Sequence, residues 1–273
     1  MKKHLPLVDT DKTPPIAVGI TLAVIYLLAS LGPSFSYLVT QRVFPGYLTF
    51  VLRLLGYISI IFLIFSASND LSSYHLDKFS LLLLIIFPGF LSSVPSQVPG
   101  WALFLFTIIP IGSAILLYLR VRQLEIFQKG TLLDLAKYFT LGTGIAILFF
   151  ALANILGAAN QITPGKLSQV SILTFLFQWI TSLSISGAVE ETLFRGFLLG
   201  FLINKKGVKP WLAITLQALT FWLFHIYQGN NPIALQALIP LFGITAGWIT
   251  FKTKNITTGI FAHALYNTLL AVF

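Results

Sequence analysis

The chain has 273 residues, of which 56% are hydrophobic and only 9% are charged, and its formal net charge is +9. Soluble domains usually carry about a quarter charged residues, so this chain has too little polar surface to enclose a water-soluble core. The lack of cysteine excludes disulfides, thiolate metal sites and a cysteine nucleophile. The basic residues lie mostly in short loops between apolar runs, which indicates a membrane topology signal and argues against nucleic acid as a partner.

Hydrophobic runs follow one another along the whole chain, and a membrane-spanning helix needs about 20 apolar residues. We therefore predict an all-α fold, a polytopic transmembrane helical bundle with eight or nine spans. The number is open because Pro88 and Gly89 interrupt one run. Another run, 168–203, is too long for one plain span, so we expect it to continue into the cytosol or to break near Gly187. The nine runs are 15–38, 46–67, 79–97, 101–119, 138–158, 168–203, 211–228, 233–251 and 256–273.

The loops between these runs predict the orientation of the chain, because cytoplasmic loops carry an excess of Lys and Arg. With nine spans, every basic cluster falls on one side, which places the N-terminus in the cytoplasm. The first apolar run is as long as a spanning helix and is followed by no small-x-small cleavage site, so we expect a retained helix and a multi-pass integral membrane protein. The clusters are Lys2, Lys3 and Lys12; Arg120, Arg122, Lys129 and Lys137; Lys205, Lys206 and Lys209; and Lys252 with Lys254.

Ionisable side chains inside the C-terminal spans are the most informative feature of the sequence, because each costs about 2.5–3.5 kcal/mol to place in a bilayer. Glu191 and Arg195 are four residues apart, so they share a helix face and can pair. Glu190 points about 100° away from Glu191 on the same helix. The side chains concerned are Glu190, Glu191, Arg195, His225 and His263, accompanied by Asn267.

The depths of these groups in their predicted spans are similar. At 1.5 Å per residue, Glu190, His225 and His263 lie about 21, 22 and 12 Å from the cytoplasmic ends of their helices, and Asn267 lies about 18 Å from its own. We therefore expect one carboxylate, two imidazoles and one amide to share a cavity near the middle of the bilayer. Purely structural roles are the alternative: an ion pair for the Glu191–Arg195 pair and hydrogen bonds between helices for the others.

Three short motifs contain these residues. The segments Glu190–Arg195, Phe221–His225 and His263–Asn267 follow the patterns EExxxR, FxxxH and HxxxN/D, in this order and without departure. The set resembles the CAAX prenyl endopeptidase type II family, also called the Abi or CPBP intramembrane protease family. The resemblance covers roughly residues 168–273, which we predict to be the catalytic core, and residues 1–167 are predicted to be transmembrane helices without a motif.

The resemblance implies a role for each residue of the motifs. Glu190 would activate water with the help of His225, while His263 and Asn267 would stabilise the oxyanion of the tetrahedral intermediate. The Glu191–Arg195 pair would orient these groups. These residue types suit the reaction, because peptide hydrolysis needs a base for water and donors for the developing oxyanion.

The predicted activity is therefore that of an intramembrane endopeptidase acting on a membrane-associated or lipidated peptide or protein, with the lipid bilayer as the other partner. Zn²⁺ held by Glu190, His225 and His263 is an alternative to a metal-independent site. Two other classes stay open. Intramembrane Glu and His also form the relays of proton- or ion-coupled transporters, although no internal repeat supports this. A non-catalytic scaffold or immunity factor is the third class, and the intact motifs disfavour it.

Overall fold

The computed structural model describes residues 57–86, 100–159, 170–205, 207–225 and 233–273, with Val18, Gly19, Thr21 and Leu22. Every regular element in these ranges is helical, which confirms the all-α prediction for this part of the chain. The elements are a helix at Tyr57–Ser66, η1 (Leu71–Tyr74), α3 (Lys78–Ile86), α4 (Gly100–Val121), α5 (Glu125–Gln128), α6 (Leu132–Ile155), α8 (Ile172–Ser182), η3 (Leu183–Glu190), η4 (Thr192–Leu198), α9 (Leu199–Asn204), α10 (Pro210–His225), η5 (Ala234–Leu238), α11 (Ile239–Thr253) and α12 (Thr257–Val272).

Two helices in the described ranges are long and apolar enough to cross a membrane, at Leu132–Ile155 and Ile172–Asn204. The helices at Tyr57–Ser66 and Ile108–Val121 are apolar but shorter. The number of eight or nine spans is therefore not confirmed and stays a prediction. The predicted span 15–38 and the Pro88–Gly89 interruption lie almost entirely or wholly outside the described residues.

The helix Ile172–Asn204 comprises α8, η3, η4 and α9 and runs for 33 residues without a break. The predicted break near Gly187 is therefore wrong. A Cβ atom on Gly187 would lie 3.0 Å from the carbonyl oxygen of Ile260, so this glycine allows α12 to approach closely. The helix changes instead to π geometry in η3 and η4, on either side of Glu191. Such π segments occur frequently at functional sites.

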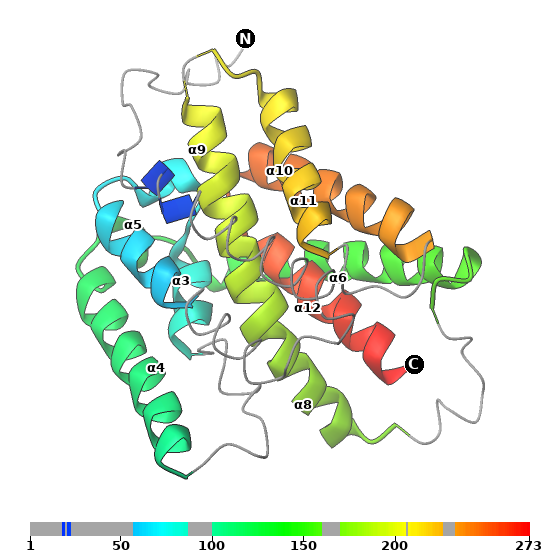
Figure 1. The fold of residues 1–273 in the computed structure, drawn as a ribbon, viewed down its shortest axis with the longest axis horizontal. Helices are drawn as coiled ribbons and strands as arrows, with labels where there is room; N and C mark the ends of the chain where they lie inside the picture. Colours follow the sequence, from blue (N-terminus) through cyan, green and yellow to red (C-terminus); the bar gives the residue numbers. More distant parts are fainter. Residues whose placement is uncertain are drawn as a thin grey trace, which may run out of the picture.

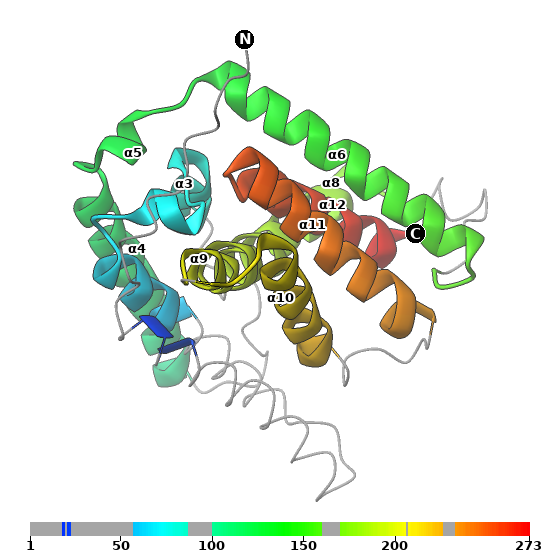
Figure 2. The ribbon, with the colours of Figure 1, turned by 90° about the horizontal axis from the view of Figure 1, so that it is seen from above.

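The 172–204 helix passes through the middle of the view in Figure 1, and the other helices pack around it. α12 lies between this helix and α6, which covers the outer side in Figure 2. α10 and α11 pack against each other. Two elements of the predicted motifs, the 172–204 helix and α12, are therefore direct neighbours.

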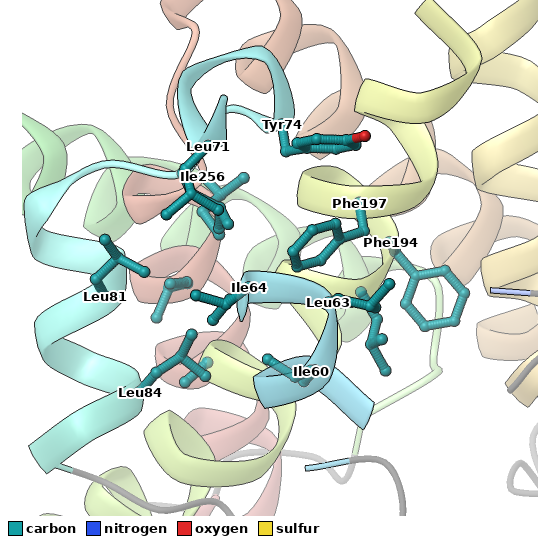
Figure 3. Packing of buried hydrophobic residues seen from close by; sticks show 14 of the residues in the cluster. Ile60, Leu63, Ile64, Leu71, Tyr74, Leu81, Leu84, Phe194, Phe197 and Ile256 are labelled. Atoms are coloured by element: carbon teal, nitrogen blue, oxygen red, sulfur yellow. The ribbon is translucent and has the colours of Figure 1, made fainter. Parts of the chain in front are cut away.

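The N-terminal half of the chain also packs against the 172–204 helix. Figure 3 shows Leu63 beside Phe197, and Ile60, Leu84 and Phe194 belong to the same cluster of fully or almost fully buried side chains. Burial of such side chains stabilises a fold by about 1.5–3 kcal/mol each in water. The outer faces of α4, α6 and α8 expose large apolar side chains instead, among them Ile115, Leu148, Ile155, Leu173 and Phe177. An apolar exterior is what a lipid environment accepts.

His75 follows η1 in a left-handed conformation with φ of 58° and is almost completely buried. Neither of its ring nitrogens has a hydrogen-bond partner among the described residues. Burial, with a smaller contribution from Lys254, lowers the pKa of His75 from 6.5 to about 3. The folded protein therefore keeps this imidazole neutral over a pH range in which the unfolded chain binds a proton.

The protein is therefore expected to become less stable as the pH is lowered below 6.5. Below pH 6.5 the unfolded chain binds one more proton than the folded one at His75, so the free energy of unfolding decreases by up to about 1.4 kcal/mol per pH unit until His75 itself is protonated. The His75→Asn variant removes the titration and tolerates the left-handed conformation. Thermal unfolding in detergent at pH 7.5 and pH 5 should show a smaller loss of stability in this variant than in the wild type. Equal losses of stability in the variant and the wild type would show that His75 does not cause the pH dependence.

Candidate active site

The structure brings five of the six predicted site residues into one cluster. Glu190, Glu191 and Arg195 lie on the 172–204 helix, His225 is the last residue of α10, and His263 lies in α12. The sixth, Asn267, lies one turn beyond His263 on α12 and is half-buried. The cluster joins three helices that are separated in the sequence.

Glu191 is the centre of a fully buried polar group. Its Oε1 atom accepts a hydrogen bond from Nη1 of Arg195 at 2.9 Å and lies 2.8 Å from Nδ1 of His263. Neither Glu191 nor Arg195 has any exposed side-chain surface. This confirms the predicted pairing of the two residues. Because the desolvation of two buried charges often exceeds their attraction, the pair is better explained by the geometry it imposes on His263 than by added stability.

Two phenylalanine rings enclose the Arg195 guanidinium. Its Cζ atom lies 4.0 Å from the centroid of Phe221 and 5.6 Å from that of Phe242. The same rings lie 5.7 and 5.0 Å from the ring of His263. Cation–π contacts of this kind stabilise a desolvated cation by up to about 2 kcal/mol. Phe221 belongs to the FxxxH motif, whereas Phe242 on α11 was missed because an isolated Phe in an apolar helix carries no signal.

Glu190, the residue before Glu191, contacts His225 on α10. Oε2 of Glu190 lies 3.5 Å from Nε2 of His225, and both side chains keep a small exposed surface, of 16% and 13%. The other ring nitrogen, Nδ1, lies 2.7 Å from the carbonyl oxygen of Phe221. A carbonyl oxygen only accepts, so Nδ1 carries a proton. The contact with Glu190 is then attractive only if one further proton is shared between Nε2 and the carboxylate.

The contact with Glu191 likewise fixes the tautomer of His263. An ionised carboxylate only accepts, so Nδ1 of His263 carries a proton. In the neutral ring Nε2 is then an acceptor, and it becomes a donor only in the imidazolium form. Sequence spacing had paired His263 with Asn267 alone, because both face the same side of one helix. The contact with Glu191 comes from a different helix and has no sequence signal.

Gly259 provides the space for the Glu191 carboxylate. A Cβ atom at this position would lie 2.7 Å from Oε2 of Glu191 and 3.5 Å from its Cδ. Gly259 was not predicted as part of the site, although its position one turn before His263 on α12 places both residues on the same face of the helix. Side chains larger than hydrogen are excluded here as long as Glu191 keeps its contacts.

We expect Gly259→Ala to displace the Glu191 carboxylate and to lower any activity that depends on His263. Overpacking of a filled site costs about 1–3 kcal/mol. Gly144→Ala is the matched control, because Gly144 lies in α6 and a Cβ there meets no atom within 4 Å. Thermal unfolding in detergent should show a loss for Gly259→Ala and none for Gly144→Ala. Equal stability of the two variants would show that Glu191 has room to move.

Metal binding requires a tighter convergence than the described residues show. In the ranges given above, no three His, Cys, Asp or Glu side chains are grouped so that they could hold a metal ion. Glu190 contacts His225 and His263 contacts Glu191, and the alternative Zn²⁺ set of Glu190, His225 and His263 stays a prediction.

The fold and the cluster define a helical protein of membrane type with buried carboxylate–imidazole contacts on neighbouring helices. Residues 171–269 match the family model of the type II CAAX prenyl endopeptidase Rce1-like proteins, a membrane-embedded protease family. This segment contains all three motifs, and the resemblance inferred from them is confirmed for it. No curated protein and no solved structure matches the chain.

Proposed function

We propose that this protein is an intramembrane endopeptidase that hydrolyses a peptide bond of a membrane-associated or lipidated peptide or protein, with water activated by Glu190. The observation that carries this proposal is the contact between Glu190 and His225. A carboxylate and an imidazole that share one proton can take a proton from water and return one to a leaving group. Both side chains retain some exposed surface, which supports a role in contact with water and substrate.

The resting pair is a Glu190 carboxylate beside a His225 imidazolium. As the water oxygen forms a bond to the scissile carbonyl carbon, its proton passes to Glu190 and the carbonyl oxygen becomes an oxyanion. The C–N bond then breaks as the leaving nitrogen takes the proton of His225. Transfer of the proton from Glu190 to His225 restores the resting pair, and the products are a carboxylic acid and an amine.

Stabilisation of the oxyanion falls to α12 in this mechanism. The amide of Asn267 is a donor in every protonation state, whereas His263 donates from Nε2 only as an imidazolium. Glu191 and Arg195 do not react; they hold His263 in one orientation. Loss of one oxyanion donor typically costs about 100- to 1000-fold in rate.

The test is steady-state cleavage of a quenched membrane peptide by the reconstituted protein. We expect Asn267→Ala to lower kcat and kcat/KM together, because an oxyanion exists only in the transition state. Binding of the peptide to the inactive Glu190→Gln form should be unaffected by the additional Asn267→Ala change. A transporter would give the opposite result: weaker binding of its substrate in Asn267→Ala, and no broken peptide bond in any variant.

Removal of metal is expected to leave cleavage unchanged, since the proposed chemistry needs only Glu190 and His225. Protein treated with phenanthroline should keep its turnover, and elemental analysis should find no stoichiometric zinc. Activity that is lost on chelation and restored by added Zn²⁺ would instead assign Glu190, His225 and His263 as ligands of a catalytic metal.

A further inference from the structure

A short segment outside the matched residues 171–269 contacts both helices that carry the site. Ser73–Asp77 comprises the end of η1 and the residues that lead to α3. Its first residues lie against the 172–204 helix, and its last residue contacts the start of α12. Figure 3 shows the adjoining side chains of Tyr74 and Phe197, whose ring centroids are 5.0 Å apart. We propose that Ser73–Asp77, the 73–77 clamp, sets the position of Glu191 relative to His263 along their helices. This role rests on the proposed function, because the geometry it fixes is that of the candidate active site.

The first half of the clamp is seated against a glycine of the 172–204 helix. A Cβ atom on Gly200 would lie 2.8 Å from Cα of Tyr74 and 2.9 Å from the carbonyl oxygen of Ser73. These are backbone atoms, which cannot move aside as a side-chain end can. Nδ2 of Asn204 donates to the same Ser73 carbonyl at 3.0 Å. The backbone of the clamp is thus in direct contact with this helix over one turn.

The second half of the clamp is bonded to the first residues of α12. Oδ1 of Asp77 accepts from Oγ1 of Thr257 at 2.7 Å, and its Oδ2 accepts from Nδ2 of Asn255. The backbone N–H of Ile256 donates to the carbonyl of His75 at 3.1 Å. Asn255 and Thr257 are almost completely buried. Three directional hydrogen bonds therefore hold the start of α12.

At the site itself the two helices meet through close contacts at Gly187 and Gly259 and through the hydrogen bond between Glu191 and His263. The bonds of the clamp add directional contacts at the start of α12, away from the site. A shift of one residue moves a helix by about 1.5 Å, which is enough to break the 2.8 Å contact of His263 with Glu191. The clamp prevents this shift because it binds both helices at once.

The His75 backbone supports this reading. A left-handed conformation in a non-glycine residue is unfavourable and persists only where the surrounding structure imposes it. Here it ends η1 and directs the carbonyl of His75 toward Ile256. The chain therefore contacts the 172–204 helix before this turn and the start of α12 at and after it.

The experiment uses two substitutions with matched controls in the full chain. Asp77→Asn leaves a single acceptor oxygen, so the side chain can no longer accept from both Asn255 and Thr257. Asp70→Asn in the same loop is its control. Gly200→Ala introduces a Cβ against the clamp backbone. Gly196→Ala is its control, because a Cβ there would lie at an ordinary 3.4 Å from Leu76 and Tyr74.

Two readouts separate the clamp from the proposed function. The chain has no cysteine, so spin labels at Leu173→Cys and Ala271→Cys report the distance between α8 and α12 without any activity. We expect Asp77→Asn and Gly200→Ala to shift or broaden this distance and to lower kcat by about 100-fold with KM nearly unchanged. Both controls should stay within about twofold of the wild type and keep its distance distribution.

The outcomes are distinct. An unchanged distance in folded Asp77→Asn and Gly200→Ala, or a shifted distance with unchanged kcat, would overturn the clamp. If the distance shifts as expected but the wild-type protein cleaves no membrane peptide, the clamp stands as a device that sets helix position and the proposed protease function fails.

Discussion

Replacement of Glu190 by glutamine is expected to abolish peptide cleavage and to leave the fold intact. Glutamine has nearly the same shape but cannot take a proton from water, and loss of a positioned base typically costs about 100- to 10,000-fold in rate. Glu190 also lies at the edge of the buried cluster, in contact with His225 and with part of its side chain exposed. Beside the neutral amide, His225 can give up its second proton and become neutral, so no charge is left without a partner and stability should change little.

The measurement is cleavage of a quenched membrane peptide by reconstituted protein, alongside thermal unfolding in detergent. Glu125→Gln is the control, because Glu125 is a surface carboxylate paired with Lys129 far from the motifs. It should cleave at the wild-type rate. If Glu190→Gln also does so, Glu190 is not the base and the proposed mechanism is wrong.

Replacement of the neighbouring carboxylate is expected to have a different effect. Glu191→Gln should lower stability as well as activity, because it removes the carboxylate that pairs with the buried Arg195. Loss of one partner of a buried ion pair typically costs about 3–5 kcal/mol. The neutral amide oxygen of glutamine is also a weaker hydrogen-bond acceptor for Arg195 and His263 than the carboxylate, which contacts both residues. Thermal unfolding and the amount of inserted, monodisperse protein measure the loss.

A double variant isolates the cause of that loss. In Glu191→Gln/Arg195→Met the buried cation is gone, and replacement of a buried ion pair by apolar groups is often neutral. The double variant should therefore recover much of the stability lost by Glu191→Gln, while its activity stays low because His263 is no longer oriented. A double variant that is less stable than Glu191→Gln would show that Arg195 contributes mainly through its packing on Phe221 and Phe242.

The adjacent carboxylates are expected to differ in function because they contact different helices. Glu190 contacts α10 through His225, and Glu191 contacts α12 through His263. Helical geometry predicted that they point in different directions, and the i,i+4 spacing predicted the pairing of Glu191 with Arg195. The partners on α10 and α12 were expected near them only because their depths in the predicted spans were similar.

Composition by itself determined the class of this protein. With 9% charged residues the chain has too little polar surface to enclose a water-soluble core. The runs of apolar residues have the length that membrane-spanning helices need. Three motifs at helical spacing predicted the candidate site residues and indicated the family resemblance, which the match of residues 171–269 confirms. These properties are local: they depend on residue type and on distances within one helix, which a sequence contains in full.

The tertiary structure decided what depends on contacts between helices. Gly187 suggested a break, but the helix continues through it, and α12 approaches closely at this glycine. The enclosure of Arg195 by Phe242, the contact of His263 with Glu191 and the seat of Tyr74 against Gly200 have no sequence signal. Each depends on the rotation and axial position of one helix against another. Packing among residues far apart in the chain sets the rotation and the axial position of each helix. The residue pattern of a single helix does not determine them.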